Sequence, residues 1–383
     1  MKIKSVFARV IPNSRNQPTI EVVVNKKYKA AAPSGASTGA TEVKAFPNKG
    51  INFAVDFINN YNDFTGMKFE EFNELEVFDE LIGNIGGNGV IALQFAVLKA
   101  MAENKVWKFL NPKAKKLPTP VGNVIGGGAH TKEKASDIQE YLLIPKAKTF
   151  EEKAFLNSYI HKKIKTVVNA KHKTDEGAWI TKLSDIEIFE ALNEFLDDDK
   201  NTLGERVNLG IDMAASEFYK NNAYEYHNFS KTVKKRKLSR KQQIDFVNSL
   251  IDDYNLKYVE DPLDENDFLG FSRINKKTLV CGDDLITTNL DRLKKAIKFN
   301  SVNCVIIKPN QIGSVIKTKQ VVDYAHKNNV KTIISHRSGE TYDATISHLA
   351  VAWKIPYLKC GIYGKERRAK IEECIKIEKE IFE

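Results

Sequence analysis

The second half of the chain repeats a short apolar run that is rich in β-branched residues and ends on a polar, chemically active residue. The runs VNLGID, LKYVED and TLVCGDD reach carboxylates, VNCVIIK and YLK reach lysines, and VKTIISH reaches a histidine. Runs of this kind predict buried strands. The last five of these ends are 23 to 28 residues apart, which leaves room for one strand, one helix and two loops in each step. The interval predicts a βα barrel, whose strand ends meet at one face, where barrel enzymes carry their chemistry.

The first part of the chain has a different pattern. Alternating and β-branched runs predict three strands, and apolar residues at helical spacing then predict three helices. The strands are expected at residues 5–11, 20–24 and 26–32, and the helices at residues 51–62, 70–82 and 89–106. A loop of small residues, PSGASTGATE, separates the two groups.

A proline- and lysine-rich segment, NPKAKKLPTP, predicts a linker between these two parts. We therefore expect a smaller N-terminal α+β domain at residues 1–115 and a C-terminal βα (TIM-like) barrel at residues 116–383. The last segment of the barrel domain, residues 366–383, is expected to be a helix.

Composition adds a basic balance to this picture. The 383 residues include 59 Lys and Arg against 49 Asp and Glu, a formal net charge of +10. A basic chain can bind nucleic acid or anionic lipid, but the strongest basic run, residues 231–241, contains no aromatic residue. We interpret it as a solvated loop that leads through Ser239, an N-cap, into a helix at residues 240–254. Nucleic acid is therefore not an expected partner.

The cysteines and the N-terminus indicate where the protein works. The four cysteines form no Cys-x-x-Cys pair, and no stretch of about 18 apolar residues is present. The N-terminus alternates like a strand and has no apolar signal core. These features predict a cytoplasmic protein with reduced thiols and no membrane span.

Three carboxylates, Asp212, Glu260 and Asp283, follow successive apolar runs. Like charges repel in one pocket unless a cation holds them together, and oxygen ligands without His or Cys favour magnesium over zinc. The three residues are therefore candidate metal ligands. Lys308 and Lys359 would face the cation. Since a bound metal and a second ammonium group both lower the pKa of a lysine, one of the two lysines could accept a proton.

The segment ISHRSGET places His336, Arg337 and Ser338 together, and arginine is suited to a bidentate contact with phosphate or carboxylate. Two further carboxylates, Glu140 and Glu176, stand in DIQEYL and KTDEGAW. If they lie close together, repulsion and burial raise the pKa of one of them, which then stays protonated and can donate. The spacing equally allows plain loop acids.

A glycine-rich segment, GNVIGGGAH, does not fit the Gly-x-Gly-x-x-Gly pattern of a dinucleotide site. It predicts instead a flexible loop that delivers His130 to the pocket.

Together these motifs resemble one family, the enolases, which are the phosphopyruvate hydratases of glycolysis. The resemblance rests on SGASTG, NVIGGGAH, DIQE, DEGAW, GIDMAASEFY, VEDPLDE, GDDLITTN, IKPNQIGS and SHRSGET, which occur in this order over nearly the whole chain. Several of these variants are most similar to archaeal members. The resemblance implies an N-terminal α+β domain, a barrel with an irregular ββαα start, and magnesium-dependent, reversible dehydration of 2-phosphoglycerate to phosphoenolpyruvate. A homodimer is the usual assembly of the family, and octamers also occur.

The resemblance also implies the metal ligands. Carried over to the matching positions, Asp212, Glu260 and Asp283 would hold the first Mg²⁺. Ser37, in the SGASTG loop, would help to bind a second Mg²⁺, which arrives with the substrate as that loop closes.

The remaining candidates take catalytic or binding roles by the same resemblance. Lys308 would remove the proton from carbon 2, and Glu176, supported by Glu140, would donate to the hydroxyl that leaves carbon 3. The phosphate, the carboxylate and the developing charge would be held by His130, His336, Arg337, Ser338 and Lys359.

The chain departs from the family in places. Thr41 stands where a histidine is common after SGASTG, Cys360 follows the binding lysine where threonine is usual, and the segment after the SGASTG loop is short. These changes bear on lid closure, turnover and oligomer contacts, and every expected catalytic position is still present.

Two other interpretations remain open at this point. A racemase or dehydratase of the enolase superfamily that acts on sugar acids typically carries Lys-x-Lys on the second barrel strand, where this chain has IQEYL. A non-catalytic enolase-like protein, which binds RNA, plasminogen or another partner, would be expected to lose Lys308 or Glu176 first, and both are present.

Overall fold

A computed structural model describes residues 1–35, 39–198 and 206–382 of the chain. It begins with a small antiparallel sheet of strands β1 (Val6–Pro12), β2 (Pro18–Val24) and β3 (Tyr28–Ala31). The central strand β2 is the most buried of the three, because its β-branched side chains pack against the helices that follow. The three predicted strands are therefore present, and the tight turn between the first two is made by NSRNQ.

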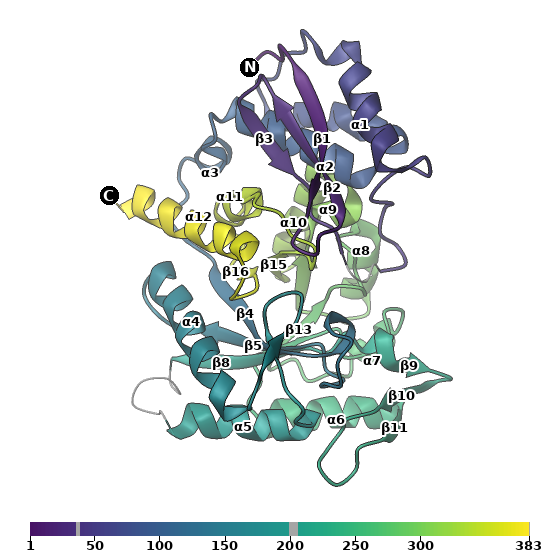
Figure 1. Cartoon of the computed structure of the whole chain (residues 1–383). Coiled ribbons are helices and arrows are strands. Elements are labelled where there is room, and N and C mark those ends of the chain that lie inside the picture. Colours follow the sequence, from purple (N-terminus) through teal and green to yellow (C-terminus); the bar gives the residue numbers. More distant parts are fainter. Residues whose placement is uncertain (36–38, 199–205, 383) are drawn as a thin grey trace.

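Helices α1 (Gly50–Asn60) and α2 (Ile82–Met101) pack on this sheet (Figure 1). The other helical segments of the N-terminal domain are η1 (Asn62–Phe64), η2 (Phe72–Leu81) and α3 (Val106–Leu110). The second predicted helix, at residues 70–82, forms a 3₁₀ segment rather than an α-helix. The chain leaves helical conformation at Gly86, with φ 72° and ψ 171°, so that α2 begins with a sharp change of direction.

Within the described residues, eight strands close into the C-terminal barrel, because the last of them pairs with the first. They are β4 (Thr119–Gly126), β5 (Glu140–Pro145), β8 (Val207–Asp212), β12 (Tyr258–Glu260), β13 (Leu279–Gly282), β14 (Cys304–Ile307), β15 (Lys331–Ser335) and β16 (Tyr357–Lys359). Strand β5 runs antiparallel to both its neighbours, whereas the other pairings in the barrel are parallel.

The order of the first elements confirms the expected irregular start, since two strands are followed by two helices before β8 begins. The helices around the barrel are α4 (Phe150–Val167), α5 (Asp185–Asp198), α6 (Arg240–Asp253), α7 (Phe268–Phe271), α8 (Leu290–Lys298), α9 (Pro309–Ile312), α10 (Val315–Lys327), α11 (Thr345–Ala352) and α12 (Lys365–Phe382). Ser239 caps α6 as predicted, because its side chain accepts a hydrogen bond from the backbone of Gln242.

One part of the basic run is not a loop. Residues Arg236–Ser239 form strand β11, which pairs with β10 (Ala223–Tyr226) next to β9 (Tyr219–Lys220). Leu238 is buried opposite Tyr224 in this small sheet, and this contact explains why a charged segment becomes a strand. The short strands β6 (His172–Lys173) and β7 (Trp179–Ile180) extend the barrel sheet at β4.

The N-terminal domain covers the face of the barrel at which the parallel strands end (Figure 1). Ser34 and Gly339 exchange backbone hydrogen bonds of 2.8 Å, and the side-chain nitrogen of Asn310 donates to the carbonyl of Pro33 at 2.9 Å. Lys99, in α2, pairs with Asp343 at 2.6 Å. Loops from both domains therefore enclose the strand ends.

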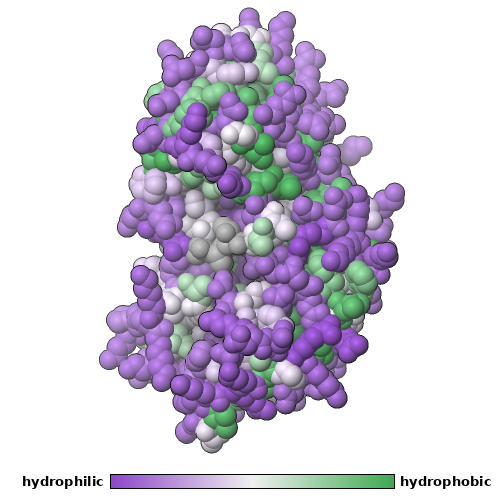
Figure 2. Space-filling model, turned by 90° about the vertical axis from the view of Figure 1, so that its right-hand side faces the viewer, coloured by the Kyte–Doolittle hydropathy of each residue, from purple (hydrophilic) through white to green (hydrophobic). Residues whose placement is uncertain are grey.

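One helical stretch of the described residues, Phe72–Met101, is long and apolar enough to cross a membrane by length and composition. Its most apolar window has a mean hydropathy of 1.5, but 78% of that window is buried inside the protein, as expected of a core helix. The face shown in Figure 2 is mostly hydrophilic and carries only scattered hydrophobic patches.

Candidate active site

The predicted strand-end residues meet at one face of the barrel. Asp212 ends β8 and Glu260 ends β12, and the two stand opposite each other in the register of these neighbouring strands. Glu140, at the start of the reversed strand β5, is the register partner of Asp212 on the other side. Because β5 runs backwards, the first residue of this strand reaches the face that the last residues of the parallel strands reach.

Lys359, at the end of β16, is the centre of this carboxylate group. Its Nζ lies 2.7 Å from Asp212 Oδ2, 2.7 Å from Glu260 Oε2 and 3.1 Å from Glu140 Oε2. All four side chains are at most 5% exposed. Burial lowers the pKa of Lys359, but the three carboxylates outweigh it and raise the pKa well above its ordinary value.

A second ammonium group belongs to Lys308, which directly follows β14. Its Nζ donates to Asp283 Oδ2 in a short ion pair, and the other oxygen of Asp283 accepts from Gln311 at 2.9 Å. Burial lowers the pKa of Lys308, but Asp283 raises it above its ordinary value. A divalent cation on these carboxylates would compete with both ammonium groups for the same oxygens and so lower both lysine pKa values.

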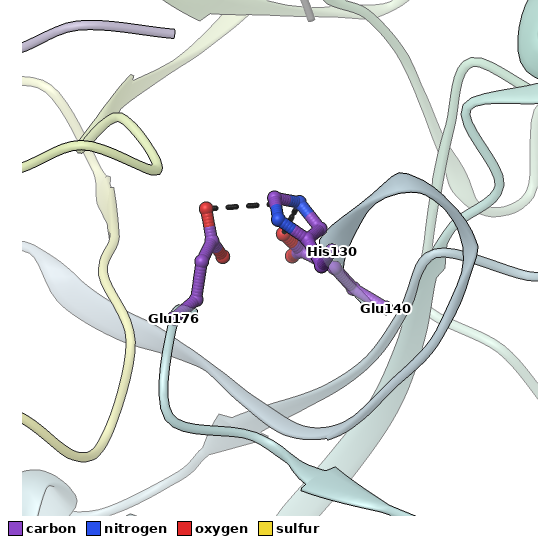
Figure 3. A group of neighbouring side chains, drawn as sticks. All are labelled: His130, Glu140 and Glu176. Atoms are coloured by element: carbon purple, nitrogen blue, oxygen red, sulfur yellow. Dashed lines mark ion pairs between the residues drawn. The ribbon is translucent and has the colours of Figure 1, made fainter. Parts of the chain in front are cut away.

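Glu140 also belongs to a histidine-centred group, which it forms with His130 and Glu176 (Figure 3). His130 Nε2 lies 3.7 Å from Glu140 Oε1 and 3.7 Å from Glu176 Oε1, while its Nδ1 donates to Asp175 at 2.9 Å. On the other side of Glu176, His336 Nε2 lies 3.5 Å from Oε2. The two glutamates are thus close enough to influence one another, as the sequence allowed.

Within this group the environment shifts the pKa values of the two glutamates in opposite directions. Burial raises the pKa of Glu140 well above its ordinary value, although Lys359 opposes the shift. Burial also acts to raise the pKa of Glu176, but His130 and His336 lower it well below its ordinary value. Burial acts to lower the pKa of His130, but Glu176 and Asp175 raise it to about 9. The two pKa shifts have opposite directions, so Glu140 holds a proton more readily than Glu176 does.

The residues after β15 carry side chains that are suited to binding an anion. Arg337 contacts Glu42 through both terminal nitrogens at 3.0 and 3.1 Å and also donates to Asn310 at 3.1 Å. The hydroxyl of Ser338 is buried and has no hydrogen-bond partner among the described residues. Arg337 is therefore fixed in place by a carboxylate of the N-terminal domain, and Ser338 offers a free donor.

The donor set fits a divalent cation that prefers oxygen. Glu260 Oε1 is buried and has no hydrogen-bond partner among the described residues, although Oε2 of the same carboxylate contacts Lys359 and Tyr258. Asp283 lies in a second cluster with Asp261 and Asp284, whose oxygens come within 4.8 Å of one another. Buried, crowded carboxylate oxygens of this kind are stabilised by a hard cation such as Mg²⁺.

Part of the Asp261 cluster has a structural explanation. The Asp261 carboxylate accepts hydrogen bonds from the backbone nitrogens of Asp283 and Asp284, at 3.0 and 2.7 Å, and so ties two strand ends together. Burial and the neighbouring Asp283 raise the pKa of Asp284 to about 7, and burial and Asp212 raise the pKa of Glu260 to about 8. The pocket therefore carries more acidic groups than its two lysines neutralise.

The structure adds residues that the sequence patterns did not single out. Glu42, Gln139 and Gln311 line the pocket or contact its carboxylates. Gln139 stands in DIQE and Gln311 in IKPNQIGS, two of the motifs that carry the resemblance. Glu42 follows the SGASTG loop, and its pairing with Arg337 spans 295 residues, beyond any local signal. Ser37 lies outside the described residues.

The cavity among these residues has a volume of about 40 Å³, which is room for only a few water molecules. A larger groove of about 930 Å³ lies between α4 and α12. We assign the chemistry to the small cavity because the buried acids, lysines and histidines converge there, whereas the groove is lined mainly by helix surfaces.

Two positions depart from the pattern of the family that the sequence resembles: Thr41 is exposed, and Cys360 is buried. The hydroxyls of Thr41 and Thr287 lie 2.6 Å apart, and Cys360 is buried with its Sγ directed at the carbonyl of Arg367. Thr41 therefore tethers the segment after the SGASTG loop to the loop that follows β13.

Comparison with known proteins agrees with this geometry. A family described as "Enolase, C-terminal TIM barrel domain" matches residues 114–383, and one described as "Enolase, N-terminal domain" matches residues 3–110. The enolase of Methanothermobacter thermautotrophicus is 38% identical over 405 residues, which cover 99% of this chain and 97% of the relative. The enolase of Archaeoglobus fulgidus is 40% identical over 401 residues, with 99% and 97% covered.

Proposed function

The chain belongs to the enolase family, and from this premise we propose how its own residues dehydrate 2-phosphoglycerate to phosphoenolpyruvate. The reaction is reversible, and it is hard for two reasons. The proton on carbon 2 is weakly acidic because it stands beside a carboxylate, and hydroxide is a poor leaving group. The pocket needs positive charge near the substrate carboxylate, a base for carbon 2 and an acid for the hydroxyl on carbon 3.

A divalent metal is part of the family's chemistry, and the identity of the ion and the number of sites are our proposals. Asp212, Glu260 and Asp283 would hold a Mg²⁺, and Ser37 would help to hold a second one that binds with the substrate. When bound, Mg²⁺ offsets the negative charge that develops on the substrate carboxylate as the proton leaves. The unpartnered, buried Oε1 of Glu260 supports this assignment.

Lys308 is the proposed base. It must be neutral to take the proton from carbon 2, and its ammonium form is favoured as long as it pairs with Asp283. Binding of a cation by Asp283 would remove that support, so loading of the site and activation of the base are coupled. A Lys or His base combined with Mg²⁺ is the known arrangement of enolase-superfamily sites, so the pairing itself is taken from the family.

Glu176 is the proposed acid, with Glu140 in support. The proton that leaves with the hydroxyl, as water, must be present on this pair of carboxyls before the step. Burial raises the pKa of Glu140 and so favours a proton on it, and His130 lies 3.7 Å from both carboxyls. We propose that Glu140 and His130 supply the proton that Glu176 donates.

The phosphate and the carboxylate of the substrate need cationic and hydroxyl donors. We assign them to His130, His336, Arg337, Ser338 and Lys359. The free buried hydroxyl of Ser338 supports the phosphate side of this assignment, since a buried donor without an acceptor is costly. The enzyme would act in glycolysis and gluconeogenesis in the cytoplasm, as a homodimer or a higher homo-oligomer.

The observation that carries the proposal is the convergence of Lys308, Lys359 and carboxylates from several strand ends on one cavity. We expect purified protein to form the enol-pyruvate absorbance from 2-phosphoglycerate only when Mg²⁺ is present. Lys308→Ala and Glu176→Gln should each lower kcat by about 100-fold or more without unfolding the protein.

The exposed Lys317 provides a matched control, since its side chain is 49% exposed and forms an ion pair with Asp79. Lys317→Ala should keep wild-type turnover. Circular dichroism would show that all three variants are folded. Absence of turnover by the wild type, together with tight binding of RNA, would instead support the non-catalytic interpretation.

A further inference from the structure

A buried arginine lies behind the proposed anion site. Arg367 belongs to the first turn of α12, and it is 1% exposed, which is unusual for a guanidinium group. Sequence patterns do not mark it, because nothing in ERRAKIEE distinguishes it from the exposed Arg368 that follows it. Only the structure separates the two.

The guanidinium of Arg367 contacts the backbone of the loop that carries Arg337 and Ser338. Nη2 donates to the carbonyl of Ser338 at 2.6 Å and lies 3.5 Å from the carbonyl of Arg337. Nη1 donates to the hydroxyl of Ser14 at 2.8 Å. That hydroxyl lies 3.1 Å from the Ser338 carbonyl and accepts from the backbone of Glu340 at 3.0 Å. Arg367 therefore joins the N-terminal domain, α12 and the loop after β15.

The guanidinium of Arg367 forms no ion pair with a carboxylate among the residues that the structure describes, and its buried Nε has no acceptor among them. Lys370, one turn further along α12, is equally buried but pairs with Glu340 at 2.5 Å. Burying a charge without an ion pair costs free energy. We therefore explain the burial of Arg367 by an interaction with a negatively charged group that binds in the pocket.

The positive charge of Arg367 lies close enough to the site to shift the pKa values of two of its residues. Burial lowers the pKa of His336, and Arg367 lowers it further. For Glu176, burial acts to raise the pKa, while His130, His336 and Arg367 lower it. The hydroxyl of Ser338, whose backbone Arg367 holds, is buried and has no partner among the residues described.

We propose that Arg367 is a positioning residue for the substrate phosphate. It fixes the carbonyls of Arg337 and Ser338 so that their side chains face the phosphate, and its positive charge, which forms no ion pair among the described residues, favours a dianion at this place. The inference rests on the proposed function, because it assumes that Arg337 and Ser338 bind the phosphate of 2-phosphoglycerate.

The test compares three substitutions in α12 with one in the turn between β1 and β2. Arg367→Met removes the positive charge and the guanidinium hydrogen-bond donors, whereas Arg367→Lys keeps only the charge. Ser14→Ala removes one hydrogen-bond partner but leaves the arginine. Arg368→Met is the matched control, because it removes one positive charge from a side chain that is 76% exposed. The measurements are KM and kcat, the Kd of 2-phosphoglycerate and of inorganic phosphate by calorimetry, and the Kd of Mg²⁺.

For Arg367→Met we expect KM and both anion Kd values to rise about tenfold or more, with kcat lowered less and the Kd of Mg²⁺ within about twofold of wild type. Arg367→Lys should recover part of the anion affinity, Ser14→Ala should show a smaller loss than Arg367→Met, and Arg368→Met should match wild type.

A folded Arg367→Met variant with wild-type KM and anion affinity, whatever its thermal stability, would overturn the inference. If Arg367→Met does not fold, Arg367→Lys and Ser14→Ala decide, because wild-type anion affinity in both would refute it. These outcomes are distinct from a failure of the proposed function, in which the wild type itself neither turns over 2-phosphoglycerate nor binds it.

Discussion

At the scale of single residues, the pocket is a set of charges that hold one another in place. Lys359 forms ion pairs with three carboxylates, Lys308 pairs with Asp283, and Arg337 pairs with Glu42. Each pairing is buried, so the removal of one member leaves its partner uncompensated in a medium of low dielectric constant. Substitutions here change both the chemistry and the stability of the protein, and the two effects must be measured separately.

His130 makes this linkage visible in the pH dependence of stability. Its pKa is about 9 in the folded protein against 6.5 for an ordinary histidine. A raised pKa means that the folded state binds the proton more tightly, so the contribution is complete below pH 6.5 and is lost as the pH rises through about 9. We expect the free energy of unfolding of the wild type to fall in this window by up to about 3 kcal/mol more than that of His130→Asn.

Urea unfolding at intervals between pH 6 and pH 10 would measure this difference. His172→Asn is the control, because His172 also pairs with a carboxylate, Glu133, but both side chains are more than half exposed. The prediction would be contradicted if the free energy of unfolding changed with pH in the same way for the wild type and for His130→Asn.

Tyr258 gives a second prediction at this scale. It lies two residues before Glu260 in β12, is fully buried, and donates its hydroxyl to Glu260 Oε2. Groups that hold a metal ligand in place affect metal affinity by about 10- to 100-fold. Tyr258→Phe removes only the hydroxyl, so we expect the Kd of Mg²⁺ to rise about tenfold, as measured by calorimetry without substrate.

Tyr254 supplies the comparison, since it is only partly buried and packs against Phe189 outside the barrel. Tyr254→Phe should leave the Kd of Mg²⁺ unchanged. An unchanged Kd for Tyr258→Phe would show that Lys359 and the strand alone orient Glu260.

At the scale of elements, the sequence predicted the barrel well because its strands are buried on both sides. Such strands read as continuous apolar runs, and each ends where a polar side chain can reach the pocket. The apolar runs alone were therefore enough to assign residues such as Asp212 and Lys308 to the pocket. Strand β11 and the two-residue strands could not be predicted in this way, since their pairing depends on Tyr224 and on other contacts outside the segment. The pairing of Glu42 with Arg337 depends on the closed fold. The domain boundary near residue 115 stays a prediction.

Gly86 is the position at which an element depends most clearly on its residue type. Its φ of +72° is unfavourable for residues with a side chain, and a Cβ there would lie 2.4 Å from the carbonyl oxygen of Ala45 and 2.5 Å from Cα of Phe46. Both obstacles are backbone atoms, which cannot rotate away. We expect Gly86→Ala to lower the free energy of unfolding by about 2 kcal/mol or more.

Gly83, in the same helical stretch, is the matched control. A Cβ at Gly83 meets nothing within 4 Å, so Gly83→Ala should be neutral or slightly stabilising, by less than about 1 kcal/mol. Thermal and urea unfolding of the two variants would decide. Equal effects at both positions would mean that general flexibility, not the contact with residues 45–46, controls this helix.

At the scale of the whole molecule, the pocket lies in a joint region, the interface between the N-terminal domain and the barrel. Glu42 reaches it from the N-terminal domain, Ser14 and Ser34 bind the loop after β15, and the strand ends reach it from the barrel. A ligand that binds in this joint binds the folded chain and not the separated parts. Ligand binding and the stability of the complete fold should therefore be coupled.

Mg²⁺ provides the most direct measurement of this coupling. A ligand that binds only the native state stabilises it by about 2.7 kcal/mol at one hundred times its Kd, and the acidic excess of the pocket gives Mg²⁺ a place to bind. We expect the Tm of the wild type to rise with Mg²⁺ and to fall again when a chelator is added. Asp283→Asn should lose most of this response, because it removes the carboxylate charge that pairs with Lys308 and would bind the cation. Asp291→Asn, at a side chain that is 89% exposed, should respond like wild type. An equal rise of Tm in all three proteins would mean that Mg²⁺ acts on the general surface charge, and the carboxylate site would then be assigned wrongly.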